Sequence, residues 1–377
     1  MRNQGAQHKR THYLPMTNSI TAPGTQPAST LVWDVYCKVI DNYGDVGVCW
    51  RLARNLIQRG QRVRLFIDNA DALAWMADLN DLAHPQLSVH DWHDAVDACG
   101  DVVIEAFGVN LPESTELALA SGAAAGRMLS WLNLEYLSAE PASKDNHGLS
   151  SPVSQGPAGG LMKQFFYPGF VHGTGGILRD DDTYHQAMTP QALTWPPKSM
   201  ALFSYESPSL GLLINQATEM GMNIQTAAGR TTAHVQQLAD QDNIGVDNIG
   251  MMPHCTQQQF DTWLAEQDFL VVRGEDSLTR AIWAGKPFLW HLYPQEDGAH
   301  RIKLNAFLDW LDAPTDMRNA FKTLNGTRSL REDTLMFPSN KVRWQAWTQC
   351  VRAARSKLLA QNDLVTRLIL HVQKTVG

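Results

Sequence analysis

Short apolar runs alternate with amphipathic segments along most of the chain, and this alternation predicts the fold. Residues 31–40 form the first apolar run, residues 41–47 a turn with two glycines and two aspartates, and residues 48–58 place their apolar positions on one helical face. The same order returns, with strands expected at 62–67, 101–105 and 127–132 and helices at 70–78 and 112–120. Strands that alternate with helices are typical of a parallel, doubly wound α/β sheet.

A second alternation of the same kind begins after Pro196 and Pro197. Its strands are expected at 200–205, 223–226 and 269–272, and its helices at 210–219, 256–266, 278–283 and 299–311. Residues 138–165 are rich in Ser, Pro, Gly and Ala, and they are expected to form a long ordered loop. Residues 341–376 are strongly helical, and a helix of that length reaches back to the first half.

These two halves predict two Rossmann-like domains. We expect an N-terminal domain at 31–195, a C-terminal domain at 196–349, and a final helix at about 350–377 that packs back on the first domain. Residues 1–30 are polar and lack an apolar central segment, so they are predicted to be a disordered tail and not a secretory signal.

Composition argues against several classes of protein. The chain has 377 residues and a net charge of −7, which argues against sequence-independent nucleic-acid binding. Its five cysteines form no CxxC pair and are odd in number, as expected for reduced thiols in a cytoplasmic protein. No apolar run is long enough to cross a bilayer, so neither a nucleic acid nor a membrane is expected as a partner.

The most informative stretch for chemistry is 269–283. An apolar strand is followed by the polar segment 273–277, and a helix is expected to begin at Leu278. In an open α/β sheet this is where ligands bind, because the free N–H groups of a helix N-terminus attract an anion. Arg273 adds a bidentate grip on phosphate, whereas Glu275 and Asp276 repel phosphate and suit a sugar hydroxyl.

The turn at 41–47 offers a second set of acids. Asp41 and Asp45 lie four residues apart, and both can point into one site. An acid pair suits an acceptor that is cationic or must lose a proton, and one acid can act as a base. An aspartate at such a turn is often only a helix N-cap, and this interpretation of Asp45 stays open. The turn lacks GxGxxG, which disfavours a nicotinamide oxidoreductase.

Other candidates carry weaker signals. Tyr205, at a predicted strand end, is equally typical of a core tyrosine with a satisfied hydroxyl. His291 and His300 flank acidic residues, but their spacing fits no known set of metal ligands, and a helix cap and a surface histidine are the preferred interpretation. No metal site is therefore expected.

Three stretches resemble one known family. IDNYGDVGVCWRLARNL at 40–56, VVRGEDS at 271–277 and WAGKPFLWHLYPQEDGAHRIKLNAFL at 283–308 are similar to the EarP family, the protein-arginine rhamnosyltransferases that modify elongation factor P. The resemblance runs from about Val32 to the C-terminal helix. It implies the GT-B fold, in which two Rossmann-like domains face a central cleft.

The resemblance also implies a reaction. Rhamnose would pass from dTDP-β-L-rhamnose, held by the C-terminal domain, to an arginine of elongation factor P, held mainly by the N-terminal domain. Transfer would invert the anomeric centre, need no metal or other cofactor, and activate elongation factor P for ribosomes stalled on polyproline.

Site residues follow from the matching motifs. Asp41 and Asp45 match the essential aspartate pair, with Asp45 as the base, and Glu275 matches the essential glutamate. The substrate-binding positions are Tyr205, Arg273, Asp276, Ser277, Gln257, Phe203, Phe260, Asn42, Tyr43 and Gly44, of which Phe203, Gln257 and Phe260 line the nucleotide pocket. Two positions depart from the family: His254 stands where an aromatic residue is usual, and Leu278 replaces a more usual Phe.

The chemistry of arginine constrains the mechanism. A guanidinium has a pKa above about 12 and is a poor nucleophile while charged. We therefore expect Asp45 to take the proton late, as the C–N bond forms, while Asp41 or Glu275 fixes the guanidinium. Arg273, Tyr205 and helix amides would stabilise the departing diphosphate. Two alternatives remain: a GT-B enzyme with another acceptor, such as a small molecule or lipid carrier, and a non-catalytic protein that binds elongation factor P.

Overall fold

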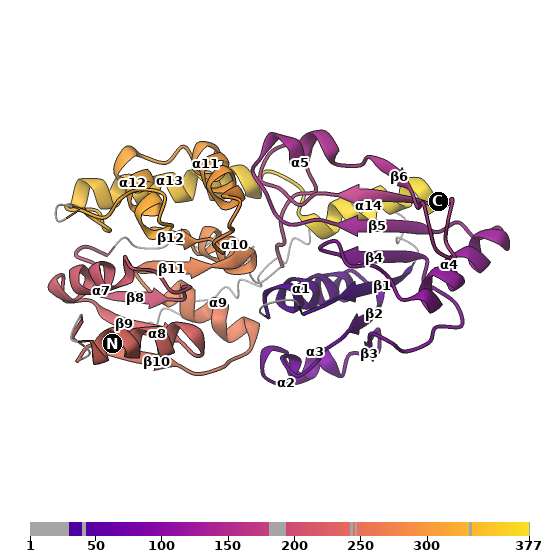
Figure 1. Cartoon of the computed structure of the whole chain (residues 1–377), viewed down its shortest axis with the longest axis horizontal. Coiled ribbons are helices and arrows are strands. Elements are labelled where there is room, and N and C mark those ends of the chain that lie inside the picture. Colours follow the sequence, from indigo (N-terminus) through magenta and orange to yellow (C-terminus); the bar gives the residue numbers. More distant parts are fainter. Residues whose placement is uncertain are drawn as a thin grey trace, which may run out of the picture. The chain divides into compact units, whose positions relative to one another are not determined.

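The computed structural model describes residues 30–39, 43–180, 194–241, 244–245, 247–331 and 334–376. The predicted tail at 1–30 lies outside the described residues except for Thr30, and so do Asp41 and Asn42. Within the described part, two β-sheets carry helices on their faces (Figure 1).

The first sheet has seven strands in the order β3-β2-β1-β4-β5-β7-β6. They are β1 Val32–Cys37, β2 Arg62–Ile67, β3 Leu87–Asp91, β4 Val102–Ala106, β5 Ser130–Leu134, β6 Ser150–Pro152 and β7 Met162–Phe166. Its helices are α1 Gly44–Gln58, α2 Leu73–Met76, α3 Leu79–Leu82, α4 Glu113–Ala124 and α5 Pro141–Asn146. All neighbours pair in parallel except β6 with β7, and Val35 of β1 pairs with Leu65 and Ile104. Strands β4 and β5 are buried at every position, as expected for a parallel sheet covered on both faces.

The second sheet has five parallel strands in the order β10-β9-β8-β11-β12. They are β8 Ser199–Leu202, β9 Asn223–Ala227, β10 Ile249–Met252, β11 Phe269–Arg273 and β12 Phe288–His291. Its helices are α7 Leu210–Glu219, α8 Arg230–Asp240, α9 Gln257–Glu266, α10 Gly274–Ala284, α11 Ala299–Leu311 and α12 Thr315–Leu324, and the chain ends with α13 Lys341–Leu359 and α14 Leu364–Val376.

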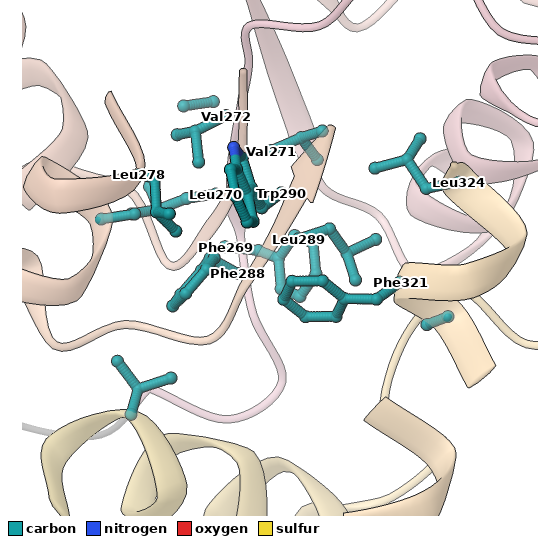
Figure 2. Close-up of a cluster of buried hydrophobic side chains, with 14 of the residues drawn as sticks. Phe269, Leu270, Val271, Val272, Leu278, Phe288, Leu289, Trp290, Phe321 and Leu324 are labelled. Atoms are coloured by element: carbon teal, nitrogen blue, oxygen red, sulfur yellow. The ribbon is translucent and has the colours of Figure 1, made fainter. Parts of the chain in front are cut away.

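The core of the second sheet forms around β11 and β12. Figure 2 shows the side chains of these two strands beside Leu278 of α10 and beside Phe321 and Leu324 of α12. Gly285 ends α10 with a left-handed φ of 66°, as predicted for its C-cap. No helix among the described residues is long and apolar enough to cross a membrane.

Two helices begin earlier than predicted. Helix α1 begins at Gly44 and α10 at Gly274, so that Asp45, Glu275 and Asp276 lie in first helical turns and not in loops. A carboxylate is stabilised by the partial positive charge of a helix N-terminus, which explains why polar segments continue directly into helices here.

The loop expected at 138–165 is instead partly regular. Helix α5 lies in it, and β6 pairs antiparallel with β7 at the edge of the first sheet. Short elements of three to six residues, rich in Ser and Pro, give little periodicity to detect. Six further elements of the described residues were not predicted from the sequence: α3, β3, β10, β12, α8 and α12.

The C-terminal helical stretch is broken in two. Asp363 begins α14 by accepting hydrogen bonds at Oδ1 from the backbone N–H groups of Val365 at 3.0 Å and Thr366 at 3.1 Å. Apolar residues of α13 belong to the core of the second sheet, whereas Leu364 and Leu368 of α14 belong to that of the first sheet. The break therefore lets one end of the chain pack in two cores.

Candidate active site

The N-terminus of α1 presents the first acid. Asp45 is the second residue of this helix and is half-buried, and Tyr43 occupies the N-cap position. Asp45 is therefore not the cap that its position in the turn also allowed. Tyr43 is exposed and meets the ring of Trp75 edge-on at a centroid distance of 5.5 Å, while Gly44 has open space around its Cα.

The N-terminus of α10 presents the second acid. Glu275 accepts a hydrogen bond at Oε2 from the backbone N–H of Leu137, at 2.7 Å, and its Oε1 forms an ion pair with Lys303 of α11. Leu137 follows β5, so this glutamate joins the second sheet to a segment of the first. Glu275 also lines a cavity together with Val48 and Phe107.

Tyr136 shows that the two acids share one neighbourhood. Burial raises the pKa of the Tyr136 phenol, and the negative charges of Asp45 and Glu275 raise it further. Its ring stacks on Phe107 at 4.6 Å, and the ammonium of Lys303 lies 5.8 Å from its centre. The structure therefore places Asp45 and Glu275 within electrostatic range of the same phenol, and Lys303 lies beside it. The signal for Tyr136 was its place two residues after a buried strand.

Arg273 lies at the end of β11 against aromatic rings. Its guanidinium is 4.4 Å from the ring centre of Phe203 and 4.8 Å from that of Tyr205, and it donates to the carbonyl of Ser204 at 3.2 Å. Burial lowers the pKa of Arg273. Among the described residues no carboxylate lies within ion-pair distance of Arg273, so its guanidinium can accept an anionic ligand.

Tyr205 and His291 form the wall beside Arg273. Both are buried, and the edge of one ring faces the other at 5.5 Å. The hydroxyl of Ser204 is 2.7 Å from Nδ1 of His291. Burial, followed by the charge of Arg273, lowers the pKa of His291 to about 4. The expectation of surface histidines was therefore wrong, and His300 is buried as well.

The residues predicted to line a nucleotide pocket are partly in contact. Phe203 and Phe260 meet edge to face at 5.6 Å. Gln257 is buried and donates from Nε2 to the carbonyl of Gly47 in α1, at 2.8 Å. His254 packs on the ring of Trp75 at 4.6 Å. Gln257 and His254 thus contact the first half of the chain.

Asp276 takes part in a buried ion cluster that the sequence did not suggest. Arg51 of α1 donates from Nε to Asp276 at 3.0 Å. It also donates from Nη1 and Nη2 to Asp261, at 2.8 and 2.6 Å. Asp180 lies 3.7 Å from Arg51, and Arg280 lies 3.8 Å from Asp276. The next residue, Ser277, donates its hydroxyl to the carbonyl of Arg273.

The neighbouring carboxylates favour the charged form of Arg51. The Arg51 side chain is 1% exposed, and burial alone lowers its pKa, but Asp261 and Asp276 outweigh burial and raise it. Burial raises the pKa of Asp261 against the opposing charge of Arg51. Among the described residues, no group of three or more His, Cys, Asp or Glu side chains is placed to hold a metal ion.

Known sequences resemble this chain along most of its length. Residues 33–373 match the family described as Elongation-Factor P (EF-P) rhamnosyltransferase EarP. A protein-arginine rhamnosyltransferase of Pseudomonas putida is 34% identical over 382 residues, which cover 89% of this chain and 97% of the relative. One of Pseudomonas aeruginosa is 36% identical over 326 residues, which cover 77% of this chain and 85% of the relative.

Solved structures share the fold. One, from "Structural basis for EarP-mediated arginine glycosylation of translation elongation factor EF-P", has a TM-score of 0.55 at 24% identity and covers 92% of this chain and 100% of that one. The calicheamicin glycosyltransferase CalG4 has a TM-score of 0.51 at 12% identity and covers 92% of this chain and 98% of its own. The GT-B fold class predicted from the sequence is confirmed.

We predict that Arg51→Met destabilises the protein by roughly 3–5 kcal/mol, because it leaves buried carboxylates without their partner. Urea unfolding measures this change. Arg230→Met is the matched control, since Arg230 and its partner Glu206 have side chains 49% and 44% exposed, and a change of at most about 1 kcal/mol is expected there. Equal losses in the two variants would show that the buried ion cluster contributes no more than a surface pair.

We also predict that His291 makes the folded state sensitive to acid. Its pKa is about 4 in the folded protein and close to 6.5 in an unfolded chain, so the unfolded state binds more protons between these values. The stabilisation is complete above pH 6.5 and is lost as the pH falls towards 4. Between these values, the stability of His291→Gln should fall less steeply than that of the wild type. His93→Gln, at an exposed position, is the control, and identical slopes for wild type and His291→Gln would contradict the assignment.

Proposed function

The chain belongs to the EarP family of elongation factor P rhamnosyltransferases, and on that premise we propose that it transfers rhamnose from dTDP-β-L-rhamnose to an arginine side chain of elongation factor P, with inversion at the anomeric carbon. The observation that carries the proposal is that Asp45 and Glu275 lie in the first turns of α1 and α10, two helices linked by the hydrogen bond between Arg51 and Asp276.

The acids suit a cationic acceptor. A guanidinium presents several N–H donors in one plane, and carboxylates accept them in pairs. Asp45 is the proposed base, and Glu275 the proposed partner that orients the acceptor or a sugar hydroxyl. Because Glu275 already accepts from Leu137 and Lys303, its orientation is set before a substrate arrives.

The donor side needs positive charge for a diphosphate. Arg273 stays charged in the neutral range and has no carboxylate within ion-pair distance among the described residues. It lies at the N-cap of α10, whose first amides also favour an anion. Phe203 and Phe260 offer aromatic surface nearby for a base. These features support a nucleotide diphosphate sugar as the donor.

The proposed step is a single displacement. An arginine nitrogen attacks C1 of rhamnose from the face opposite the diphosphate, the bond from C1 to the diphosphate oxygen breaks, and dTDP leaves. The nitrogen becomes far more acidic as it bonds, so a carboxylate of ordinary basicity can accept its proton at that stage. Asp45 takes the proton, and Arg273 with the α10 amides stabilises the charge on the leaving diphosphate.

The first test is the intact mass of elongation factor P after incubation with the protein and dTDP-rhamnose. Wild-type protein should add one deoxyhexose, and Asp45→Asn should lower turnover by about 10²- to 10⁴-fold because the base is lost. Calorimetry should show unchanged dTDP affinity. Asp71→Asn, an exposed aspartate, is the matched control and should keep wild-type turnover.

No mass gain with the wild type would refute the proposed acceptor, and with dTDP still bound it would direct attention to another acceptor. Loss of dTDP affinity in Asp45→Asn, or turnover equal to that of the wild type, would contradict the role of Asp45 as the base.

A second prediction concerns the donor. Arg273→Ala should weaken dTDP binding by about 10- to 100-fold, because charge-assisted hydrogen bonds to the diphosphate are lost. Arg343→Ala, which removes an arginine whose side chain is 50% exposed, should bind dTDP as the wild type does. Unchanged affinity in Arg273→Ala, measured by the same calorimetry, would exclude Arg273 from the donor site.

A further inference from the structure

Lys303 is the one basic side chain that the described structure pairs with Glu275. We propose that Lys303 is a positioning residue, which holds the carboxylate of Glu275 in the orientation that rhamnosyl transfer requires. This inference rests on the proposed function, because it concerns the same acids and the same acceptor.

The first step of the argument is how Glu275 is held. Lys303 pairs with Oε1, and the backbone N–H of Leu137 donates to Oε2 at 2.7 Å. Each oxygen therefore has a donor of its own, and the plane of the carboxylate is fixed. The two donors come from different parts of the chain, since Leu137 follows β5 and Lys303 lies on α11.

The second step is burial. The side chains of Lys303 and Glu275 are only 21% and 18% exposed. An ion pair in full solvent contributes little and reorients freely, but a largely desolvated pair is costly to separate. This pair therefore sets a geometry and is more than a chance surface contact.

The third step is that α11 itself starts from a fixed point. The segment before it turns at Gly298, whose φ is 74°, and the N–H of Ala299 donates to Oδ1 of Asp297 at 2.9 Å. The N–H of Gln295 donates to Nδ1 of the buried His300 at 3.1 Å. Lys303 lies in the next turn of the helix, so these contacts at the start of α11 also determine where its side chain begins.

The fourth step is charge. Lys303 also lies 5.8 Å from the ring of Tyr136, whose phenol feels both Asp45 and Glu275. The ammonium of Lys303 partly offsets the negative charge near Tyr136, and an arriving guanidinium would offset more of it. A carboxylate has about four acceptor positions, so Glu275 keeps two for a substrate after Lys303 and Leu137 are bound.

The test compares Lys303→Met and Lys303→Arg with the wild type in the transfer assay on elongation factor P. Lys303→Met keeps the length of the side chain and removes its charge, and we expect kcat to fall by about 10- to 100-fold through misplacement of Glu275. The dTDP affinity should stay close to wild type, while the melting temperature should fall because Glu275 loses its partner. Lys303→Arg should recover much of the lost kcat. Arg301→Met, which removes a positive charge from an exposed position of the same helix, should leave kcat unchanged.

Each of the other outcomes would contradict either this inference or the proposed function. A kcat of Lys303→Met equal to that of the wild type would overturn the inference. A large loss of dTDP affinity in Lys303→Met would overturn it in favour of a direct contact between Lys303 and the diphosphate. A lowered melting temperature in both Lys303→Met and Lys303→Arg, with kcat recovered in neither, would leave the pair a purely structural role. Failure of the wild type to modify elongation factor P would instead refute the proposed function, so the two failures are distinguishable.

Discussion

The buried guanidinium of Arg51 is the contact on which the arrangement of the candidate site depends. It lies on α1, the helix whose first turn holds Asp45, and it binds Asp276 in the first turn of α10, next to Glu275. A second carboxylate, that of Asp261 in α9, accepts hydrogen bonds from the two terminal nitrogens of the guanidinium. Apolar packing is non-directional, whereas a bidentate arginine contact fixes both distance and angle. The bidentate contact joins α1 to α9, and the hydrogen bond from Nε to Asp276 joins α1 to α10.

Two hydrogen bonds to backbone groups add to the restraint that Arg51 imposes. Gln257 reaches the carbonyl of Gly47 from α9, and the N–H of Leu137 reaches Glu275. All three contacts lie within a few residues of an acid that we assign to the reaction. In both sheets a buried strand is the element before a helix with an acid in its first turn, directly so for β11 and α10 and with residues 38–43 between β1 and α1. In each case the helix dipole stabilises the ionised carboxylate.

The sequence predicted the two alternating halves and the fold class, because strand-to-helix periodicity is a local signal, and its contiguous motifs named Asp45 and Glu275 as candidates. It did not predict the partners of those acids. Arg51 is 225 positions from Asp276, and the tie between Lys303 and Glu275 runs between separate helices, so no periodicity records either contact. The helix starts at Gly44 and Gly274 were missed because polar first turns look like loops.

Two residues of the same type thus differ in their ability to bind an external ligand, because their surroundings differ. Arg51 is saturated by carboxylates, while Arg273 rests on the faces of Phe203 and Tyr205 and donates to the carbonyl of Ser204. Only the second retains donors for an external anion. Adjacent acids divide in the same way, although both line one cavity: Asp276 serves the buried ion cluster, and Glu275, held by Leu137 and Lys303, has acceptor positions left over. A motif names both members of such a pair as candidates, and the packing around each decides which one can meet a substrate.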